Sequence, residues 1–327
     1  MPRVTDPAPP APRLSLDDAA AAIRGGRLVA FGTETVYGLG ADATNPAAVA
    51  AVFAAKQRPA FDPLIVHVAS AAAVPDAVAD WSPRQQRLAA AFWPGPLTML
   101  APRGDRIAEL VTSGLPDVAV RVPGTDAARQ LIARAGCPVA APSANLFGRI
   151  SPTTADHVLD QLAGRIAGVL DTGPCGVGLE STVVRVPADE SQPVRVLRLG
   201  GLTLEAIAAV AGEAELAADS DRAELTAPQS PGRLPQHYAP RVPLRLVDTP
   251  QPAAEEGLLA WQQPTEGFGA VEVLTPTGSD AEAAAALFAA LRRLDEAGVR
   301  AIQAERVPDA GLGAAINDRL RRAAHPG

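Results

Sequence analysis

The sequence predicts an α/β protein with two domains of unequal size. Over roughly the first two hundred residues, short apolar runs typical of strands alternate with segments of helical composition, an order that indicates a mixed sheet covered by helices. Residues 211–241 are acidic and then rich in Pro and Gly, which is the composition of a linker. Strand-like and helical segments resume after it. We therefore predict a first domain over 13–210, a linker over 211–241 and a smaller domain over 242–327.

Helix-start signals place the helices. Ser15 is a favourable N-cap for a helix running to Gly25, with aspartates in its first turn. Asn45 and Pro46 supply the cap and the first position of a helix that ends near Gln57. The other predicted helices open at Ser82-Pro83 or lie over 203–210, 280–297 and 309–323.

Short runs rich in Val, Ile and Leu predict the strands. In chain order they are RLVAF (27–31), LIVHV (64–68), PLTMLA (96–101), VAVRV (118–122), VAAPSAN (139–145), VLDTG (169–173), STVVRV (181–186), VRVLRL (194–199), PLRLV (243–247), FGAVEVL (268–274) and VRAIQA (299–304). The polar segment GTETVYGLG (32–40) is predicted to be a loop after the first strand. It is neither a Walker motif nor GxGxxG, and it is either an ordinary loop or one that turns hydroxyls and amides towards a ligand.

Composition restricts the class of protein. The 327 residues are 47% hydrophobic and 20% charged, with a net charge of −7, as expected of a globular protein and not of one that coats nucleic acid. Cys137 and Cys175 are too few for a disulfide scaffold and lack metal-ligand spacing, so we expect buried thiols in a reducing cytoplasm. No apolar run of 18 residues suggests a membrane span, and the Pro-rich N-terminus does not read as a signal peptide.

Lys56 is the only lysine among the 29 Lys and Arg residues. An ammonium group is a compact ligand for phosphate oxygens, whereas a guanidinium is a planar fork, so the two are not equivalent in a phosphate site. Arg58 follows two residues later, before Pro59, and the two cations can face one anion such as a triphosphate. A solvated lysine on an amphipathic helix is the alternative.

Other polar residues stand at strand ends or inside apolar strands. Asp62 could hold Mg²⁺ or cap a turn, and His67 could be a ligand or an ordinary core histidine. Arg121 interrupts an apolar strand and requires an anionic partner, which is either a substrate carboxylate or a structural Asp or Glu. Ser143 and Asn145 either bind phosphate oxygens or cap a turn.

Taken in order, these segments resemble a known family. GTETVYGLG, KQRPAFDPLIVHV, WPGPLT, VAVRVP, APSAN, GLESTVV, VLRLGG and HYAP together resemble the threonylcarbamoyl-AMP synthases in their longer two-domain Sua5 form. The resemblance is dense over 13–205 and rests on architecture beyond. It implies a twisted mixed-sheet YrdC-like catalytic domain and a smaller Rossmann-like α/β C-terminal domain.

The implied activity is the condensation of L-threonine, bicarbonate or CO2, and ATP into threonylcarbamoyl-AMP and pyrophosphate. A separate tRNA threonylcarbamoyl transferase complex then passes the activated group to N6 of adenosine 37 in tRNAs. The implied cofactor is Mg²⁺, which arrives with ATP, because no direct metal-binding motif is present. No membrane association and no strong direct nucleic-acid binding are expected.

The resemblance also assigns roles to residues. It implies that Lys56 and Arg58 hold the nucleotide phosphates as the catalytic pair, and the rest of its ATP site is Asp62, Ser143, Asn145, Ser151, Arg198 and Tyr238. Its threonine site is Thr35, His67, Arg121, Ala141 and Ser181, with Arg121 paired to the carboxylate. This chain departs from the family pattern at Asp62, where many relatives carry asparagine, and in the linker SPGRLPQHYAP, which lacks the usual methionine and basic residue after the glycine.

Two other functions remain open from the sequence. One is carbamoyl transfer as in hydrogenase maturation, whose enzymes share this domain but carry zinc-finger cysteine pairs that this chain lacks. The other is an RNA-binding or ribosome-associated module without catalysis. The acidic balance and the cationic pair at Lys56 and Arg58 disfavour it.

Overall fold

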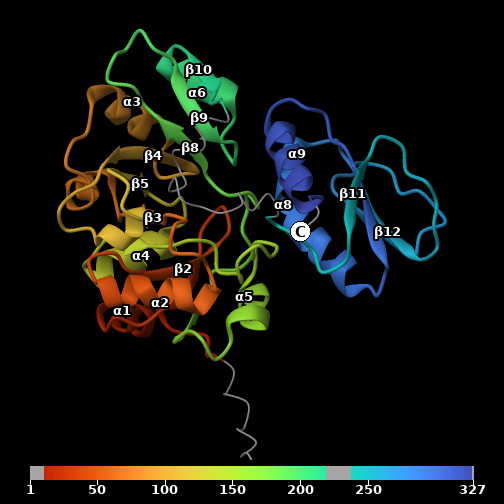
Figure 1. Ribbon diagram of the computed structural model, residues 1–327, viewed down its shortest axis with the longest axis horizontal. Helices are drawn as coiled ribbons and strands as arrows, with labels where there is room; N and C mark the ends of the chain where they lie inside the picture. Colours follow the sequence, from red (N-terminus) through yellow and green to blue (C-terminus); the bar gives the residue numbers. More distant parts are fainter. Residues whose placement is uncertain (1–10, 219–236, 326–327) are drawn as a thin grey trace, which may run out of the picture.

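The computed structural model describes residues 11–218 and 237–325. Within them lie two sheets, a mixed sheet of ten strands in the order β10-β9-β8-β4-β5-β3-β6-β2-β1-β7 and a parallel sheet of four strands in the order β11-β14-β12-β13. Each sheet forms its own body with helices against it (Figure 1). The predicted fold class, an α/β mixed-sheet unit followed by a smaller α/β unit, is confirmed.

The first sheet and its helices account for most of the described chain. Their bounds are α1 (Leu16–Arg24), β1 (Val29–Gly32), β2 (Tyr37–Asp42), α2 (Pro46–Lys56), β3 (Ile65–His67), the 3-10 helix η1 (Ala71–Asp76), α3 (Pro83–Phe92), β4 (Leu97–Pro102), the 3-10 helix η2 (Glu109–Thr112), β5 (Asp117–Arg121), α4 (Asp126–Ala135), β6 (Val139–Ala140), α5 (Ala155–Leu162), β7 (Gly168–Leu170), β8 (Thr182–Arg185), β9 (Val194–Arg198), α6 (Leu204–Ala211) and β10 (Ala214–Leu216).

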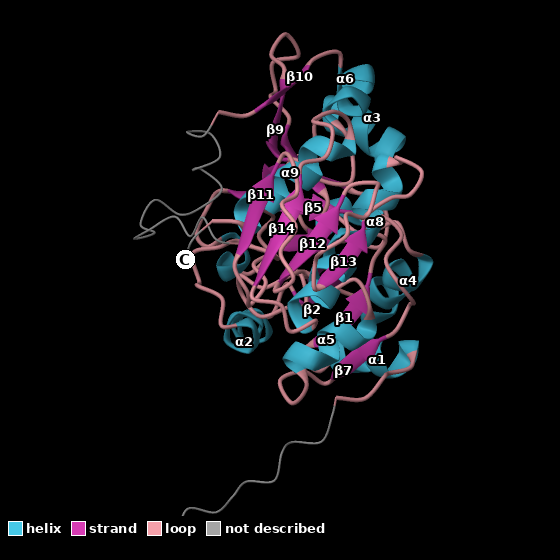
Figure 2. Ribbon diagram, turned by 90° about the vertical axis from the view of Figure 1, so that its right-hand side faces the viewer, coloured by secondary structure: helices cyan, strands magenta, loops and turns pink. Residues whose placement is uncertain are grey.

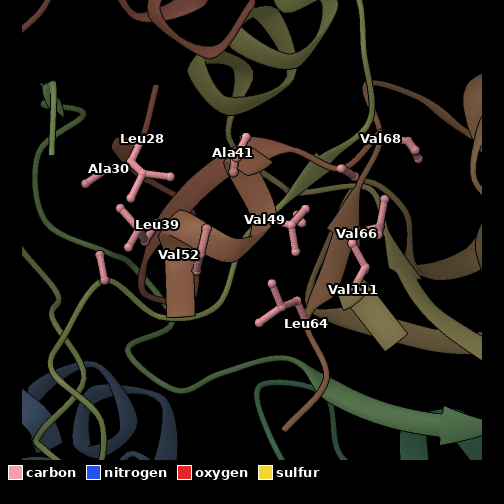
Figure 3. Packing of buried hydrophobic residues seen from close by; sticks show 14 of the residues in the cluster. Leu28, Ala30, Leu39, Ala41, Val49, Val52, Leu64, Val66, Val68 and Val111 are labelled. Carbon is pink, nitrogen blue, oxygen red and sulfur yellow. The ribbon is translucent and has the colours of Figure 1, made fainter. Parts of the chain in front are cut away.

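Helix α2 begins and ends where its sequence signals predict. The Asn45 side chain accepts hydrogen bonds from the backbone N–H groups of Ala47 and Ala48, at 3.0 and 3.2 Å, which satisfies two of the free donors of the first turn. At the other end, Gln57 adopts a left-handed conformation with φ of 54° and closes the helix. Val49 and Val52 pack with Leu39 and Val66 in the core beneath the helix (Figure 3). Lys56 is thereby fixed in the last turn.

The segment predicted as a loop over 32–40 is a strand in its second half, since β2 covers Tyr37–Asp42. Its glycines are required by packing. A Cβ at Gly40 would stand 2.7 Å from the Phe31 ring, and one at Gly38 would stand 3.3 Å from the Ala141 Cβ. Close approach of side chains to the backbone therefore explains a composition that resembles a loop.

The predicted linker also begins with regular structure. Strand β10, inside the range 211–241, pairs in parallel with β9 and extends the first sheet. Most of the remainder, 219–236, lies outside the described residues. Helices α4 and α5 and strand β12 were not predicted, although α4 has Asp126 in its first turn and Gly136 at its C-cap, and Thr154 caps α5.

The second unit comprises β11 (Leu244–Val247), β12 (Glu256–Ala260), β13 (Ala270–Val273), α8 (Asp280–Glu296), β14 (Ala301–Glu305) and α9 (Leu312–Ala323). Helices α8 and α9 lie on the side of this sheet that faces the first unit (Figure 1), and its four parallel strands run side by side in Figure 2. One apolar cluster joins the units, because Val36 and Leu179 of the first belong to the same cluster as Leu287 and Phe288 of α8. None of the described helices is long and apolar enough to cross a membrane.

Candidate active site

Neighbouring strands bring most of the candidate residues together. The parallel pairing of β3 with β5 sets His67 directly beside Arg121, and β6, on the other side of β3, leads into the segment 141–145. Ala141 is 4% exposed, and its backbone N–H donates to the Ile65 carbonyl at 2.9 Å. Across the sheet, Arg198 ends β9 and Ser181 immediately precedes β8. Residues scattered over the sequence therefore line one region of the sheet.

Lys56 is 1% exposed and connects the end of α2 to this region. Its Nζ donates hydrogen bonds to the carbonyl oxygens of Ser143 and Asn145, each at 2.5 Å. Burial lowers the pKa of Lys56 well below its ordinary value, the nearby charge of Arg58 lowers it further, and Asp62 opposes the change. An anion bound beside Lys56 would remove much of this penalty on the charged form.

Arg58 is held by the turn that follows the helix. Its guanidinium donates to the carbonyl oxygens of Asp62 and Pro63, both at 3.1 Å, and pairs with the Asp62 carboxylate at 2.8 Å. It also lies 5.9 Å from the centre of the Phe147 ring. Asp62 is thus placed as a partner of Arg58, and its carboxylate partly neutralises the cation before any ligand binds.

Asn145 has an unusual hydrogen-bonding state. Its side-chain amide donates to the carbonyl oxygens of Leu146 and Arg149, at 2.8 and 2.9 Å, but its Oδ1 is buried and has no hydrogen-bond partner in the described structure. Buried carbonyl oxygens are rarely left unpaired. This acceptor beside Lys56 is therefore suited to a ligand or to a water molecule.

Arg121 has a structural acid beside it. Its Nη2 pairs with Glu34 at 2.5 Å, Nη1 donates to the Thr35 hydroxyl at 3.0 Å, and Nε donates to the Gly95 carbonyl at 3.2 Å. The second Glu34 oxygen accepts the backbone N–H of Gly124 at 2.7 Å. Of the two partners that the sequence left open, a structural glutamate is present. These contacts use three of the five N–H groups of the guanidinium. The two that remain are enough for a bidentate contact with a carboxylate.

His67 is a neutral, buried side chain. Its Nδ1 lies 3.3 Å from the Ile65 carbonyl oxygen, and its ring meets the Phe31 ring edge to face, with the centroids 6.2 Å apart. Burial, and secondarily the charge of Arg121, lowers the pKa of His67 to about 3. The imidazole therefore stays uncharged at neutral pH, with one ring nitrogen that donates a hydrogen bond and one that accepts.

This burial predicts a specific acid sensitivity. Below the ordinary histidine pKa of 6.5 the unfolded chain gains a proton at residue 67, while the native chain does not until about pH 3. Stability is therefore lost as pH falls through this window, by about 2 kcal/mol at pH 5. We expect His67→Gln to reduce by that amount the drop in unfolding free energy between pH 7 and pH 5, measured with urea. Equal drops in both proteins would contradict this expectation.

A second group of polar residues surrounds Glu180. The Ser151 hydroxyl donates to Glu180 Oε1 at 2.6 Å. The Arg198 Nη2 donates to the carbonyl and hydroxyl oxygens of Ser181, at 2.8 and 3.2 Å, and the Ser181 hydroxyl lies 2.7 Å from that of Thr98. Ser151, Ser181 and Arg198 therefore lie close to one carboxylate that sequence reasoning did not single out, although the resemblance assigns Ser151 and Arg198 to the ATP site and Ser181 to the threonine site.

Tyr238 lies where the linker rejoins the described chain. It is 3% exposed, has a φ of 65°, and stacks on Phe288 with the ring centroids 5.5 Å apart. Burial raises the pKa of Tyr238 to about 12, so the phenol keeps its proton. The other tyrosine, Tyr37, donates to the Gly173 carbonyl at 2.8 Å from within the core, and its role is structural.

Sequence reasoning missed three charged residues of the site, namely Glu34, Glu180 and Arg319. The two glutamates lie inside the quoted segments GTETVYGLG and GLESTVV, where no pattern marks them as the acids that pair with Arg121 and Arg319. Arg319 lies on α9 beside other arginines, and no local signal distinguishes it. In the described part of the chain no cluster of His, Cys, Asp or Glu could hold a metal ion alone.

The fold, together with the two buried cationic centres at Lys56 and Arg121, points to the class of protein. A profile of the Sua5/YciO/YrdC family, described as telomere recombination, matches residues 21–200, and one described as the threonylcarbamoyl-AMP synthase C-terminal domain matches residues 202–325. The threonylcarbamoyl-AMP synthase of Bacillus subtilis is 42% identical over 322 residues, covering 94% of this chain and 92% of its own. This chain therefore belongs to the threonylcarbamoyl-AMP synthase family.

Solved structures agree with this assignment. Pyrococcus abyssi Sua5 complexed with L-threonine is similar with a TM-score of 0.85 and 36% identity, covering 96% of each chain. Full-length HypF, solved with phosphate and nucleotide bound, is similar with a TM-score of 0.50 and 21% identity, over 58% of this chain and 30% of its own. The second likeness, at 21% identity, shows a shared fold alone.

Proposed function

We propose that this protein condenses L-threonine, bicarbonate or CO2, and ATP into threonylcarbamoyl-AMP and pyrophosphate. The observation that supports this best is the presence of two separate buried cations, Lys56 and Arg121, each with hydrogen-bonding capacity left for an anion. One suits the triphosphate and the other the threonine carboxylate. Family membership over nearly the whole chain supports the same activity.

The proposed reaction needs no protein nucleophile. The threonine amine forms an N–C bond to CO2 and loses a proton, which gives a carbamate. A carbamate oxygen then bonds to the α-phosphorus while the bond to the bridging oxygen breaks, and pyrophosphate leaves with that electron pair. Both reactants are anions, so the protein must align them and reduce their repulsion. Lys56 and Arg58 would neutralise the phosphates, and Mg²⁺ would enter with ATP as part of the substrate.

The neighbouring residues complete the proposed roles. Ser143, Asn145, Ser151 and Arg198 would hold the nucleotide with the cationic pair, and Tyr238 would cover it. Thr35, His67, Ala141 and Ser181 would surround threonine. Asp62 would act through Arg58. A water-poor pocket suits the product, because a mixed anhydride hydrolyses readily.

The compartment and the fate of the product belong to the same proposal. Burial raises the pKa values of Cys137 and Cys175 to about 12, and the two thiols are free, which suits a reducing cytoplasm. The activated carbamoyl group would pass to a tRNA threonylcarbamoyl transferase complex for N6-threonylcarbamoyladenosine synthesis.

Pyrophosphate release tests this function. With ATP, Mg²⁺ and bicarbonate present, release is expected to require L-threonine, to be at least about tenfold slower with L-serine, which lacks the methyl group, and to stop without an amino acid. Omitting bicarbonate is the matched control and is also expected to stop release. Release that does not depend on threonine would contradict the proposal. Tight tRNA binding that survives Lys56→Ala would instead favour the RNA-binding alternative.

A further inference from the structure

Helix α9 sends one arginine out of the C-terminal unit and into the first. Arg319 is 1% exposed, and its Nε donates to Glu180 Oε2 at 3.0 Å. Its Nη2 donates to the Leu199 carbonyl at 2.7 Å, and its Nη1 donates to the carboxylate of Asp318, on the same helix, at 2.8 Å. The guanidinium also lies 5.2 Å from the centre of the Tyr238 ring. One side chain thus contacts the catalytic unit at two points and the end of the linker at a third.

Glu180 links Arg319 to Ser151, a residue of the proposed nucleotide site, because it accepts a hydrogen bond from each. While Oε2 faces Arg319, Oε1 accepts the Ser151 hydroxyl at 2.6 Å. Burial by itself raises the pKa of Glu180, but Arg319 and Arg198 outweigh it and hold the pKa below its usual range. Glu180 is therefore an ionised acceptor at neutral pH. Because Ser151 has given its only proton to Glu180, its Oγ offers lone pairs and suits a donor of the nucleotide, such as a ribose hydroxyl or the adenine amine.

The charge balance explains why Arg319 matters to this arrangement. Without it, Glu180 would be a buried carboxylate with Arg198 as its remaining nearby cation, and Arg198 is already bonded to Ser181. A buried acid that loses its partner tends to take up a proton or to rotate towards water. In either case Ser151 would no longer be held with its lone pairs outward.

We propose that Arg319 is a positioning residue for the nucleotide, which acts through Glu180 on Ser151 and makes ATP affinity depend on the docked C-terminal unit. This inference rests on the proposed function, since that function makes Ser151 part of the ATP site. A purely structural ion pair is the alternative. In that case the loss of Arg319 would lower the stability of the protein and would weaken the binding of ATP and of threonine to the same extent.

Calorimetry with MgATP separates the two possibilities, and Arg322 supplies the matched control. Arg319→Gln is expected to weaken ATP binding about tenfold, with the threonine KM changed less than about threefold. Arg322 lies on the same helix and also contacts Asp318, at 3.1 Å, but its side chain is 42% exposed. Arg322→Gln is expected to leave both constants unchanged.

A double-mutant cycle tests the route through Ser151. Ser151→Ala should weaken ATP binding to a similar extent, and the double variant with Arg319→Gln should be no more than about twofold weaker than the worse single variant. If Arg319→Gln does not fold, Arg319→Lys takes its place. It keeps a charge beside Glu180 but cannot bond Glu180 and Leu199 as a fork, so a loss of about threefold is expected, with the same non-additivity.

The inference is overturned if the folded Arg319 variant binds ATP as the wild type does, or if the two single effects multiply in the double variant. It can fail independently of the proposed function. Wild-type protein that binds ATP but releases no pyrophosphate with threonine would overturn the function and leave the coupling of Arg319 to Ser151 to be judged by the binding data. Threonine-dependent release together with unchanged ATP affinity in the Arg319 variants would overturn this inference alone.

Discussion

Lys56→Arg is expected to lose at least about a hundredfold in kcat/KM for ATP although it preserves the positive charge. The Lys56 ammonium is enclosed and directs two of its three protons at the carbonyl oxygens of Ser143 and Asn145, which leaves one for a phosphate oxygen. A guanidinium is longer and planar, so it cannot occupy this position without displacing the segment 143–145. Steady-state pyrophosphate release measures the loss.

Lys56→Met is the matched control, because it keeps the shape of the side chain and removes the charge. The variant also takes the donor away from the buried carbonyl oxygens of Ser143 and Asn145, so we expect a folded protein whose melting temperature is a few degrees below that of the wild type. ATP binding, followed by calorimetry, should nevertheless be lost. Near-normal turnover of Lys56→Arg, or normal ATP affinity of Lys56→Met, would show that the lone lysine serves the fold and not the nucleotide.

The sequence predicts the positions of the cations better than it predicts their partners. Lys56 stands out by composition, and the cap at Asn45 and the proline at residue 59 follow local rules, so both the residue and its place at a helix end can be foreseen. The left-handed conformation of Gln57 could not be foreseen, because glycine or asparagine usually occupies such a position. Its contact with the carbonyl of Ser143 depends on how a distant strand end is folded back. Backbone carbonyls exist at every residue, and no sequence pattern marks the two that Lys56 uses.

Glu34, Glu180 and Arg319 could not be predicted from the sequence for a different reason. Glu34 and Glu180 are needed because buried arginines require a counter-charge before a ligand arrives, but the sequence does not show which acid supplies it. Arg319 resembles the solvated face of an Arg-rich helix, and only the packing of α9 against the first unit shows that it is enclosed. Strand β2 was missed for a related reason, since its glycines are required by the close packing of distant side chains such as Phe31.

Arg121→Lys is expected to raise the threonine KM about a hundredfold and to leave the affinity for ATP unchanged. Three of the five N–H groups of Arg121 are used by Glu34, Thr35 and Gly95, and the remaining two can bind a carboxylate as a pair. Lysine keeps a charge beside Glu34, which protects the fold, but has too few donors to serve both. The lost bidentate contact corresponds to about two powers of ten in affinity.

Glu34→Gln separates support of Arg121 from competition with the substrate. If Glu34 holds Arg121 in place, as its second contact to the Gly124 backbone indicates, the neutral amide should raise the threonine KM by about threefold to tenfold. If Glu34 instead occupied the site of the substrate carboxylate, the same variant would bind threonine more tightly than the wild type. An unchanged threonine KM in Arg121→Lys would assign Arg121 to the ion pair alone and would remove the proposed carboxylate site.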